Sequence, residues 1–162
     1  MQNLLETAVN LRTQGKHEEC RSILSDLLKQ APEDAYLNYQ MAWVHDNLGL
    51  EEEAVPFYER ALRNGLTGED RKGAMLGLGS TYRCVGRHAD SVKLLTDACH
   101  EYPNDRSLRV FLALGFYDSG QTGKAMSVLL EELITTTSDE SIVKYKKALT
   151  YYANELSGEQ KN

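Results

Sequence analysis

Apolar residues recur along most of the chain at steps of three and four residues. Leu4, Ala8 and Leu11 show this spacing near the N-terminus, and Leu24 and Leu27 continue it. Such spacing places apolar side chains on one face of an α-helix. No stretch keeps the strict alternation that predicts a half-buried strand, and the chain has only three prolines. The pattern therefore predicts an all-α protein.

Four glycines divide the helical pattern at nearly equal intervals. Gly15, Gly49, Gly86 and Gly120 are separated by 34, 37 and 34 residues. A period of this length is typical of helix–turn–helix units that stack into an array, with each unit contacting its neighbours.

Alignment on these glycines places small residues at shared positions in both helices of each unit. In the first helices these residues are Ala8, Ala42, Gly79 and Ala113, and in the second helices they are Cys20, Ala54, Ser91 and Ala125. Small side chains are needed where two helices cross closely, because longer ones would push the backbones apart.

Pro32 and Pro103 follow second helices at one shared position, where proline ends a helix. Asp34 and Asp105 are then the predicted N-caps of the next helices.

With these positions the sequence resembles the tetratricopeptide repeat (TPR) family. The four units cover residues 1–34, 35–71, 72–105 and 106–139. The fourth unit departs most from the family pattern, since Thr137 replaces the proline and Glu132 replaces a small residue. The resemblance implies a right-handed superhelical solenoid, with the first helix of each pair on the concave face. We expect residues 1–162 to form a single domain of this kind.

A ninth helix is predicted over residues 138–157, after the last unit. Ser138 is its expected N-cap and Gly158 its expected end. Tyr145, Leu149 and Tyr152 belong to a single apolar stripe. Because the small-residue positions are absent here, we expect a C-terminal capping helix that covers the last apolar face, followed by a frayed tail over residues 158–162.

Charge and composition narrow the function. The net charge is −6 and the isoelectric point is near 5.2, whereas nucleic-acid binding depends on clustered Lys and Arg. No apolar run reaches the length of a membrane span, which is roughly 18–20 residues. The first residues lack the features of a signal peptide, and three cysteines with no paired spacing are typical of reduced thiols. We expect a cytoplasmic protein that binds neither nucleic acid nor membrane.

The family resemblance also implies where a partner would bind. Outward positions of the first helices carry aromatic, arginine, amide and aliphatic side chains. This predicted concave surface consists of Arg12, Tyr36, Tyr39, Gln40, Trp43, Asn47, Leu76, Ser80, Arg83, Val110, Leu114 and Tyr117. Tyr, Trp and Arg are enriched at binding hot spots. Two interpretations stay open, a partner groove and packing between repeats. In the groove interpretation, a peptide or helix docks its apolar side chains there, and its carboxylates pair with Arg12 and Arg83.

No motif predicts catalysis, a metal or a cofactor. His17 and Cys20 could share a helix face, but two ligands make a poor zinc site. Gly77 and Gly79 resemble the start of a dinucleotide fingerprint, yet a third glycine and a preceding strand are missing. His45 is expected to be buried and hydrogen-bonded. We predict a non-catalytic interaction module or scaffold. The alternatives are a self-associating protein that forms a homodimer through an end face and, more remotely, a regulatory subunit or enzyme.

Overall fold

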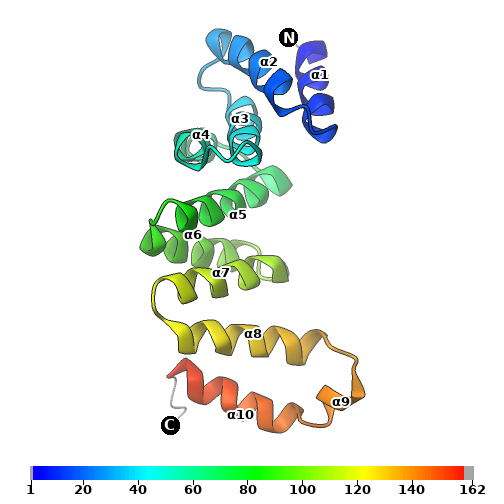
Figure 1. Ribbon diagram of the computed structural model, residues 1–162, viewed down its shortest axis with the longest axis vertical. Helices are drawn as coiled ribbons and strands as arrows, with labels where there is room; N and C mark the ends of the chain where they lie inside the picture. The colour runs from blue at the N-terminus through cyan, green and yellow to red at the C-terminus, as the bar shows by residue number, and fades with distance from the viewer. Residues whose placement is uncertain (1, 159–162) are drawn as a thin grey trace. The chain divides into compact units, whose positions relative to one another are not determined.

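The computed structural model describes residues 2–158, which form ten α-helices and, within that range, no strand (Figure 1). The all-α prediction is confirmed. The helices are α1 (Gln2–Thr13), α2 (His17–Gln30), α3 (Ala35–Asn47), α4 (Glu51–Arg63), α5 (Gly68–Cys84), α6 (His88–Glu101), α7 (Arg106–Asp118), α8 (Thr122–Thr136), α9 (Glu140–Val143) and α10 (Lys146–Ser157). Residues 159–162 of the tail that was expected to fray lie outside the described residues.

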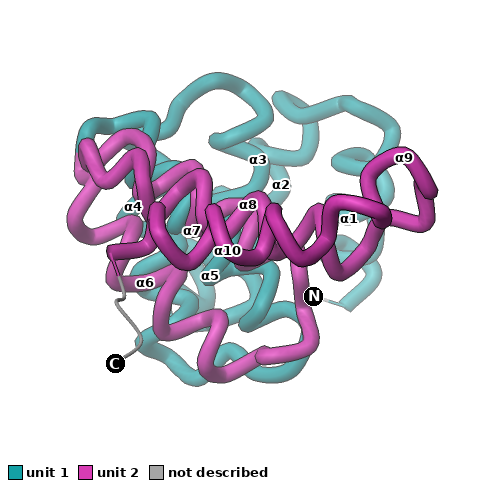
Figure 2. The backbone as a smooth tube through the Cα atoms, turned by 90° about the horizontal axis from the view of Figure 1, so that it is seen from below, with its two compact units in different colours: residues 1–86 teal, residues 87–162 magenta. Residues whose placement is uncertain are grey.

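The chain folds as two compact units, which Figure 2 distinguishes by colour. Unit 1 (Met1–Gly86) holds α1 to α5, and unit 2 (Arg87–Asn162) holds α6 to α10. The boundary falls in the turn between α5 and α6, inside the third predicted repeat. The single domain over residues 1–162 stays a prediction.

The turns and caps follow the sequence pattern. The four evenly spaced glycines all adopt a positive φ of 71–79°, the left-handed conformation that glycine tolerates best. Each lies in the turn between the two helices of a predicted unit. Asp34 Oδ1 accepts a hydrogen bond from the amide of Leu37 at 2.8 Å, and Asp105 Oδ1 accepts one from Ser107 at 3.0 Å. Both predicted aspartate N-caps are therefore confirmed.

The shared small residues lie in the core, as predicted. Ala8, Ala42, Ala54 and Ala113 are completely buried, and the aligned Ser91 is buried as well. Methyl-sized side chains at these positions let the paired helices approach closely and bury the larger residues beside them.

The last predicted helix is interrupted. Residues 138–157 form α9 and α10 in place of one helix. Asp139, rather than Ser138, is the N-cap, because its Oδ1 accepts a hydrogen bond from the Ser141 amide at 2.8 Å. The Tyr145 amide then donates to the carbonyl of Ile142 at 2.9 Å, three residues back instead of four. This tighter turn ends the first α-helical segment, and α10 begins after it.

Two tyrosines of α3 and α4 press against glycines of α5. A Cβ atom added at Gly73 would lie 2.3 Å from Tyr39 Oη, and one added at Gly77 would lie 2.5 Å from Tyr58 Oη. Tyr58 is 2% exposed, and its hydroxyl donates to Asp46 Oδ2 at 2.7 Å. The ring of Tyr58 therefore cannot move aside, and α5 can pack this closely because Gly77 has no side chain.

We expect Gly77→Ala to lower the free energy of unfolding by about 1–2 kcal/mol. The added methyl overpacks a fixed ring, which costs roughly 1–3 kcal/mol, and the gain in helix propensity of about 1 kcal/mol does not offset it fully. Urea denaturation followed by circular dichroism measures the change. Ser80→Ala on the same helix is the control and should change stability little. A stabilised Gly77→Ala protein would contradict the close packing.

Candidate partner-binding surfaces

An arginine stacks on the only tryptophan of the chain. The Arg12 guanidinium carbon, from α1, lies 3.6 Å from the centre of the Trp43 ring on α3. Arg12 Nε donates to Gln40 Oε1 at 3.0 Å. Neither Nη group of Arg12 hydrogen-bonds within residues 2–158. The guanidinium is thus held by its face and by one donor, while its other donors stay available for a carboxylate.

Two buried side chains hold the Arg12–Trp43 stack in place. Gln40 is 2% exposed and Tyr39 is 6% exposed, whereas Trp43 is 38% exposed. The Tyr39 ring lies 5.7 Å from the Trp43 ring, and its hydroxyl rests against Gly73. Burial, reinforced by the negative charge of Asp70, raises the pKa of Tyr39 to about 12. Tyr39 therefore stays neutral and acts as a fixed support.

The remaining predicted residues of unit 1 lie on α3 and α5. Tyr36 is half-buried, and burial raises its pKa. Asn47 is exposed, and its Nδ2 donates to the Trp43 carbonyl at 2.8 Å. Three half-buried residues share one face of α5, since they are four and three residues apart: Leu76, Ser80 and Arg83. We refer to Arg12, Tyr36, Trp43 and Asn47 as the α1–α3 patch.

The other predicted residues belong to unit 2. Val110 and Tyr117 are 37% and 64% exposed, and Leu114 between them is half-buried. Their spacing of four and three residues places all three on one face of α7. The structure therefore shows an apolar stripe on this helix that is exposed at both ends, at Val110 and Tyr117.

Asp46 on α3 links three helices. Its carboxylate accepts from Tyr58 on α4 and, at 3.0 Å, from Thr81 on α5. Burial raises the pKa of Asp46 in spite of these hydrogen bonds. His45 is buried as predicted, with Nδ1 2.8 Å from the Met41 carbonyl. Asp46 therefore links α3, α4 and α5, and the His45 ring, stacked 5.2 Å from the Phe57 ring, adds a contact between α3 and α4.

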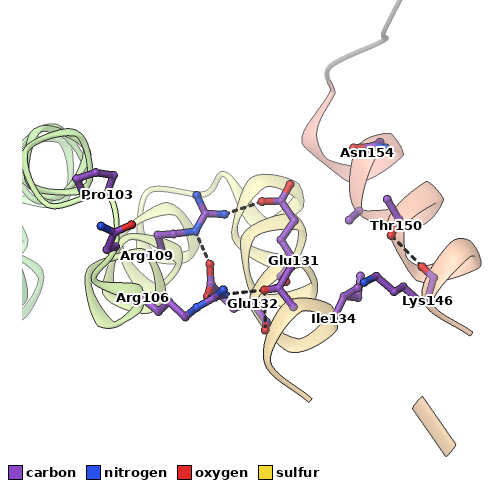
Figure 3. A pocket seen from close by; sticks show the side chains of 12 residues that line it. Pro103, Arg106, Arg109, Glu131, Glu132, Ile134, Lys146, Thr150 and Asn154 are labelled. Carbon is purple, nitrogen blue, oxygen red and sulfur yellow. Dashed lines mark hydrogen bonds and ion pairs between the residues drawn. The ribbon is translucent and has the colours of Figure 1, made fainter. Parts of the chain in front are cut away.

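Sequence reasoning missed a cavity of about 480 Å³ in unit 2, between α7, α8 and α10 (Figure 3). Arg106 Nη1 donates to Glu132 Oε2 at 2.9 Å and to Thr135 Oγ1 at 2.7 Å. Arg109 Nε donates to the other oxygen of Glu132, and Nη2 donates to Glu131 at 2.6 Å. The signal in the sequence was Glu132 at a small-residue position. We refer to this site as the α8–α10 cavity.

Glu132 is the fixed centre of this ionic network. It is 8% exposed, and each carboxylate oxygen accepts from a different arginine. Burial alone would raise its pKa, but the hydrogen bonds and charges of Arg106 and Arg109 outweigh that effect and lower the pKa below its usual 4.5. A buried carboxylate held in this way remains ionised at neutral pH.

Neither surface gathers the side chains of a metal centre within residues 2–158. Among residues 2–158, no three His, Cys, Asp or Glu side chains gather where they could hold a metal ion. The described helices include none with the length and apolar character of a membrane span. The interactions at both surfaces are stacking, hydrogen bonds and charge pairs.

Comparison with known proteins agrees with this architecture. The family model described as tetratrico peptide repeat matches residues 35–156. YrrB, a TPR protein with an unusual peptide-binding site, superposes with a TM-score of 0.72 at 16% identity, over 97% of this chain and 86% of its own. MamA from Desulfovibrio magneticus RS-1, from residue 41 to its end, gives a TM-score of 0.74 at 16% identity, over 99% and 97%. At such identity these structures show the fold alone. No curated protein sequence matches the chain.

We expect Glu132→Gln to lower the free energy of unfolding by about 1–3 kcal/mol, the scale of lost hydrogen bonds to charged groups. Because folding lowers the pKa of Glu132, its contribution is complete above about pH 4.5 and is lost as the pH falls through the folded-state value. The variant should therefore lose less stability than the parent between pH 5 and about pH 3. Denaturation at several pH values measures both effects.

Glu131→Gln is the matched control for this prediction. Glu131 is exposed, so its pair with Arg109 contributes at most about 1 kcal/mol. Equal losses in the two variants would show that Glu132 holds no special place in the network.

Proposed function

We propose that this chain, which belongs to the tetratricopeptide repeat family, acts as a non-catalytic scaffold that binds a protein or peptide partner through the α1–α3 patch. The fold is that of a protein–protein interaction module. We further propose that the residues of this patch contact the partner and that the protein is cytoplasmic. The peptide-binding site of YrrB is a precedent for such a role on this fold.

The stack of Arg12 on Trp43 carries the proposal. An indole that only filled the core would be covered, but Trp43 stays 38% exposed while Tyr39 and Gln40 beneath it are buried. Its exposed surface is therefore held rigid before any partner arrives, which reduces the entropy lost on binding. Rigid aromatic side chains beside an arginine are typical hot spots.

The same geometry defines the chemistry of the partner. The indole surface favours an apolar side chain, and the outward Nη groups of Arg12 favour a carboxylate next to it. Arg83 on α5 is proposed as a second contact for an acidic residue. Tyr39 and Gln40 take part by holding Trp43 and Arg12, rather than by touching the partner.

We expect Trp43→Ala to weaken partner binding at least about tenfold, which corresponds to roughly 1.4 kcal/mol. Affinity capture from cell extract with the parent protein identifies retained proteins, and calorimetry with the purified partner then measures each variant. Arg83→Glu is expected to weaken binding similarly. Circular dichroism should show nearly unchanged helix content in both variants.

Tyr151→Ala is the control, because Tyr151 is an exposed aromatic residue of unit 2. It should retain the affinity of the parent. Binding of equal strength by folded Trp43→Ala and Arg83→Glu proteins would remove the α1–α3 patch from the proposal.

A homodimer through α10 is the second candidate function, favoured by the apolar side chains that α10 exposes. Tyr152 and Leu156 are 56% and 42% exposed and, with Leu149, belong to one face of the helix. Patches of this kind mark interaction surfaces.

We expect light scattering over a concentration series to show a dimer if this face self-associates, and Tyr152→Asp to abolish it. A protein that stays monomeric at high concentration would exclude the homodimer while leaving the first proposal intact.

A further inference from the structure

The α8–α10 cavity lies away from the point where these two helices touch. Near the C-terminal end of α10 the helices touch, because a Cβ at Gly123 would lie 2.5 Å from the Leu156 carbonyl oxygen. The cavity lies toward the other end of α10, beside Lys146 and Thr150 (Figure 3). Its volume of about 480 Å³ is within the range of small-ligand sites, about 300–1,000 Å³.

The cavity carries an excess of positive charge in an acidic protein. Arg106, Arg109 and Lys146 line it together with Glu131 and Glu132, whereas the whole chain has a net charge of −6. Glu132 is already neutralised by the two arginines. The Lys146 ammonium makes no ion pair or hydrogen bond within the described part of the chain, and Figure 3 shows it extending from α10 toward Ile134. A carboxylate entering the cavity would therefore meet an unpaired cation.

Glu131 marks the place that such a carboxylate can take. Its pair with Arg109 is half-exposed, with side chains 47% and 36% accessible, so solvent weakens it. Glu132 is only 11% accessible in its side chain and is held by both arginines. An incoming carboxylate can thus replace Glu131 on Arg109 Nη2 without disturbing Glu132.

The cavity also has an apolar part in its lining. Ile134 and Ala153 are buried and line the cavity beside its charged groups, and Pro103 lines its edge. Ala153 is only 1% exposed, so the apolar lining that a ligand can cover is that of Ile134, at 8%, and of exposed Pro103. A peptide with an acidic side chain next to an apolar one satisfies both parts.

We propose that the α8–α10 cavity is a second binding site, for a peptide segment that carries an acidic residue beside an apolar residue. Arg109 and Lys146 bind the carboxylate in place of Glu131, and Ile134 contacts the apolar side chain. This site belongs to unit 2 and does not depend on the α1–α3 patch, so either proposal can fail without the other.

The test uses the full chain, labelled with ¹⁵N, and two blocked tripeptides as probes. Acetyl-Leu-Glu-Leu-amide should shift the amide signals of the cavity residues of α7, α8 and α10. Acetyl-Leu-Gln-Leu-amide should bind at least about fivefold more weakly, as expected for the loss of one hydrogen bond between charged groups. Acetate alone is a third arm, which should bind more weakly than the acidic peptide because it cannot contact Ile134.

Neighbouring lysines give a matched pair of variants. Lys146→Glu reverses the charge in the cavity, whereas Lys147→Glu makes the same change on the next residue, which does not line it. Both place an acid in the first turn of α10, which suits the helix dipole, so both should fold. We expect Lys146→Glu to weaken binding of the acidic tripeptide at least about fivefold and Lys147→Glu to change it little. Glu131→Gln should strengthen binding, because it removes the competing carboxylate.

Three results would overturn the proposal. Equal affinity for the Glu and Gln tripeptides would remove carboxylate recognition. Equal losses in the two lysine variants would reduce the effect to general charge attraction. The absence of amide shifts around the cavity at millimolar peptide would remove the site itself.

Discussion

The structure depends on helices that approach each other through side chains no larger than a methyl group. Ala8, Ala42, Ala54 and Ala113 are fully buried at the crossings, and α5 takes the same principle further. There Gly73 and Gly77 receive the hydroxyl ends of Tyr39 and Tyr58 directly. Close approach leaves no room for adjustment, so these tyrosine rings are fixed. Because the Tyr39 ring is fixed, the Trp43 ring that packs against it is also held in one orientation.

Much of the fold could be predicted because its causes are local and repeat. The turn glycines recur every 34–37 residues, the small residues and the aspartate caps recur with them, and the structure confirms each of these features. The start of α9 after Asp139 could not be predicted, since Ser138 and Asp139 are both good caps and only the hydrogen bond to Ser141 decides between them. No repeat pattern distinguishes two neighbouring cap residues that compete for the same helix start.

The surfaces were harder to predict because they depend on contacts between residues distant in sequence. The pattern placed Arg12 and Trp43 on the same surface and left open whether that surface binds a partner or packs between repeats, but it did not predict their stacking contact. It did not separate exposed Trp43 from buried Tyr39 and Gln40. Glu132 stood out as a departure at a small-residue position, yet the two arginines that hold it, 23 and 26 residues away, became apparent only in the structure.

The position of Trp43 also has a practical consequence. It is the single tryptophan of the chain, it is partly exposed, and a guanidinium lies on its face. Indole fluorescence of the unlabelled protein therefore arises entirely at the α1–α3 patch, and its wavelength and quenching depend on whether Arg12 remains stacked and water remains in contact. The molecule contains its own optical reporter for events in unit 1, and the α8–α10 cavity in unit 2 has none.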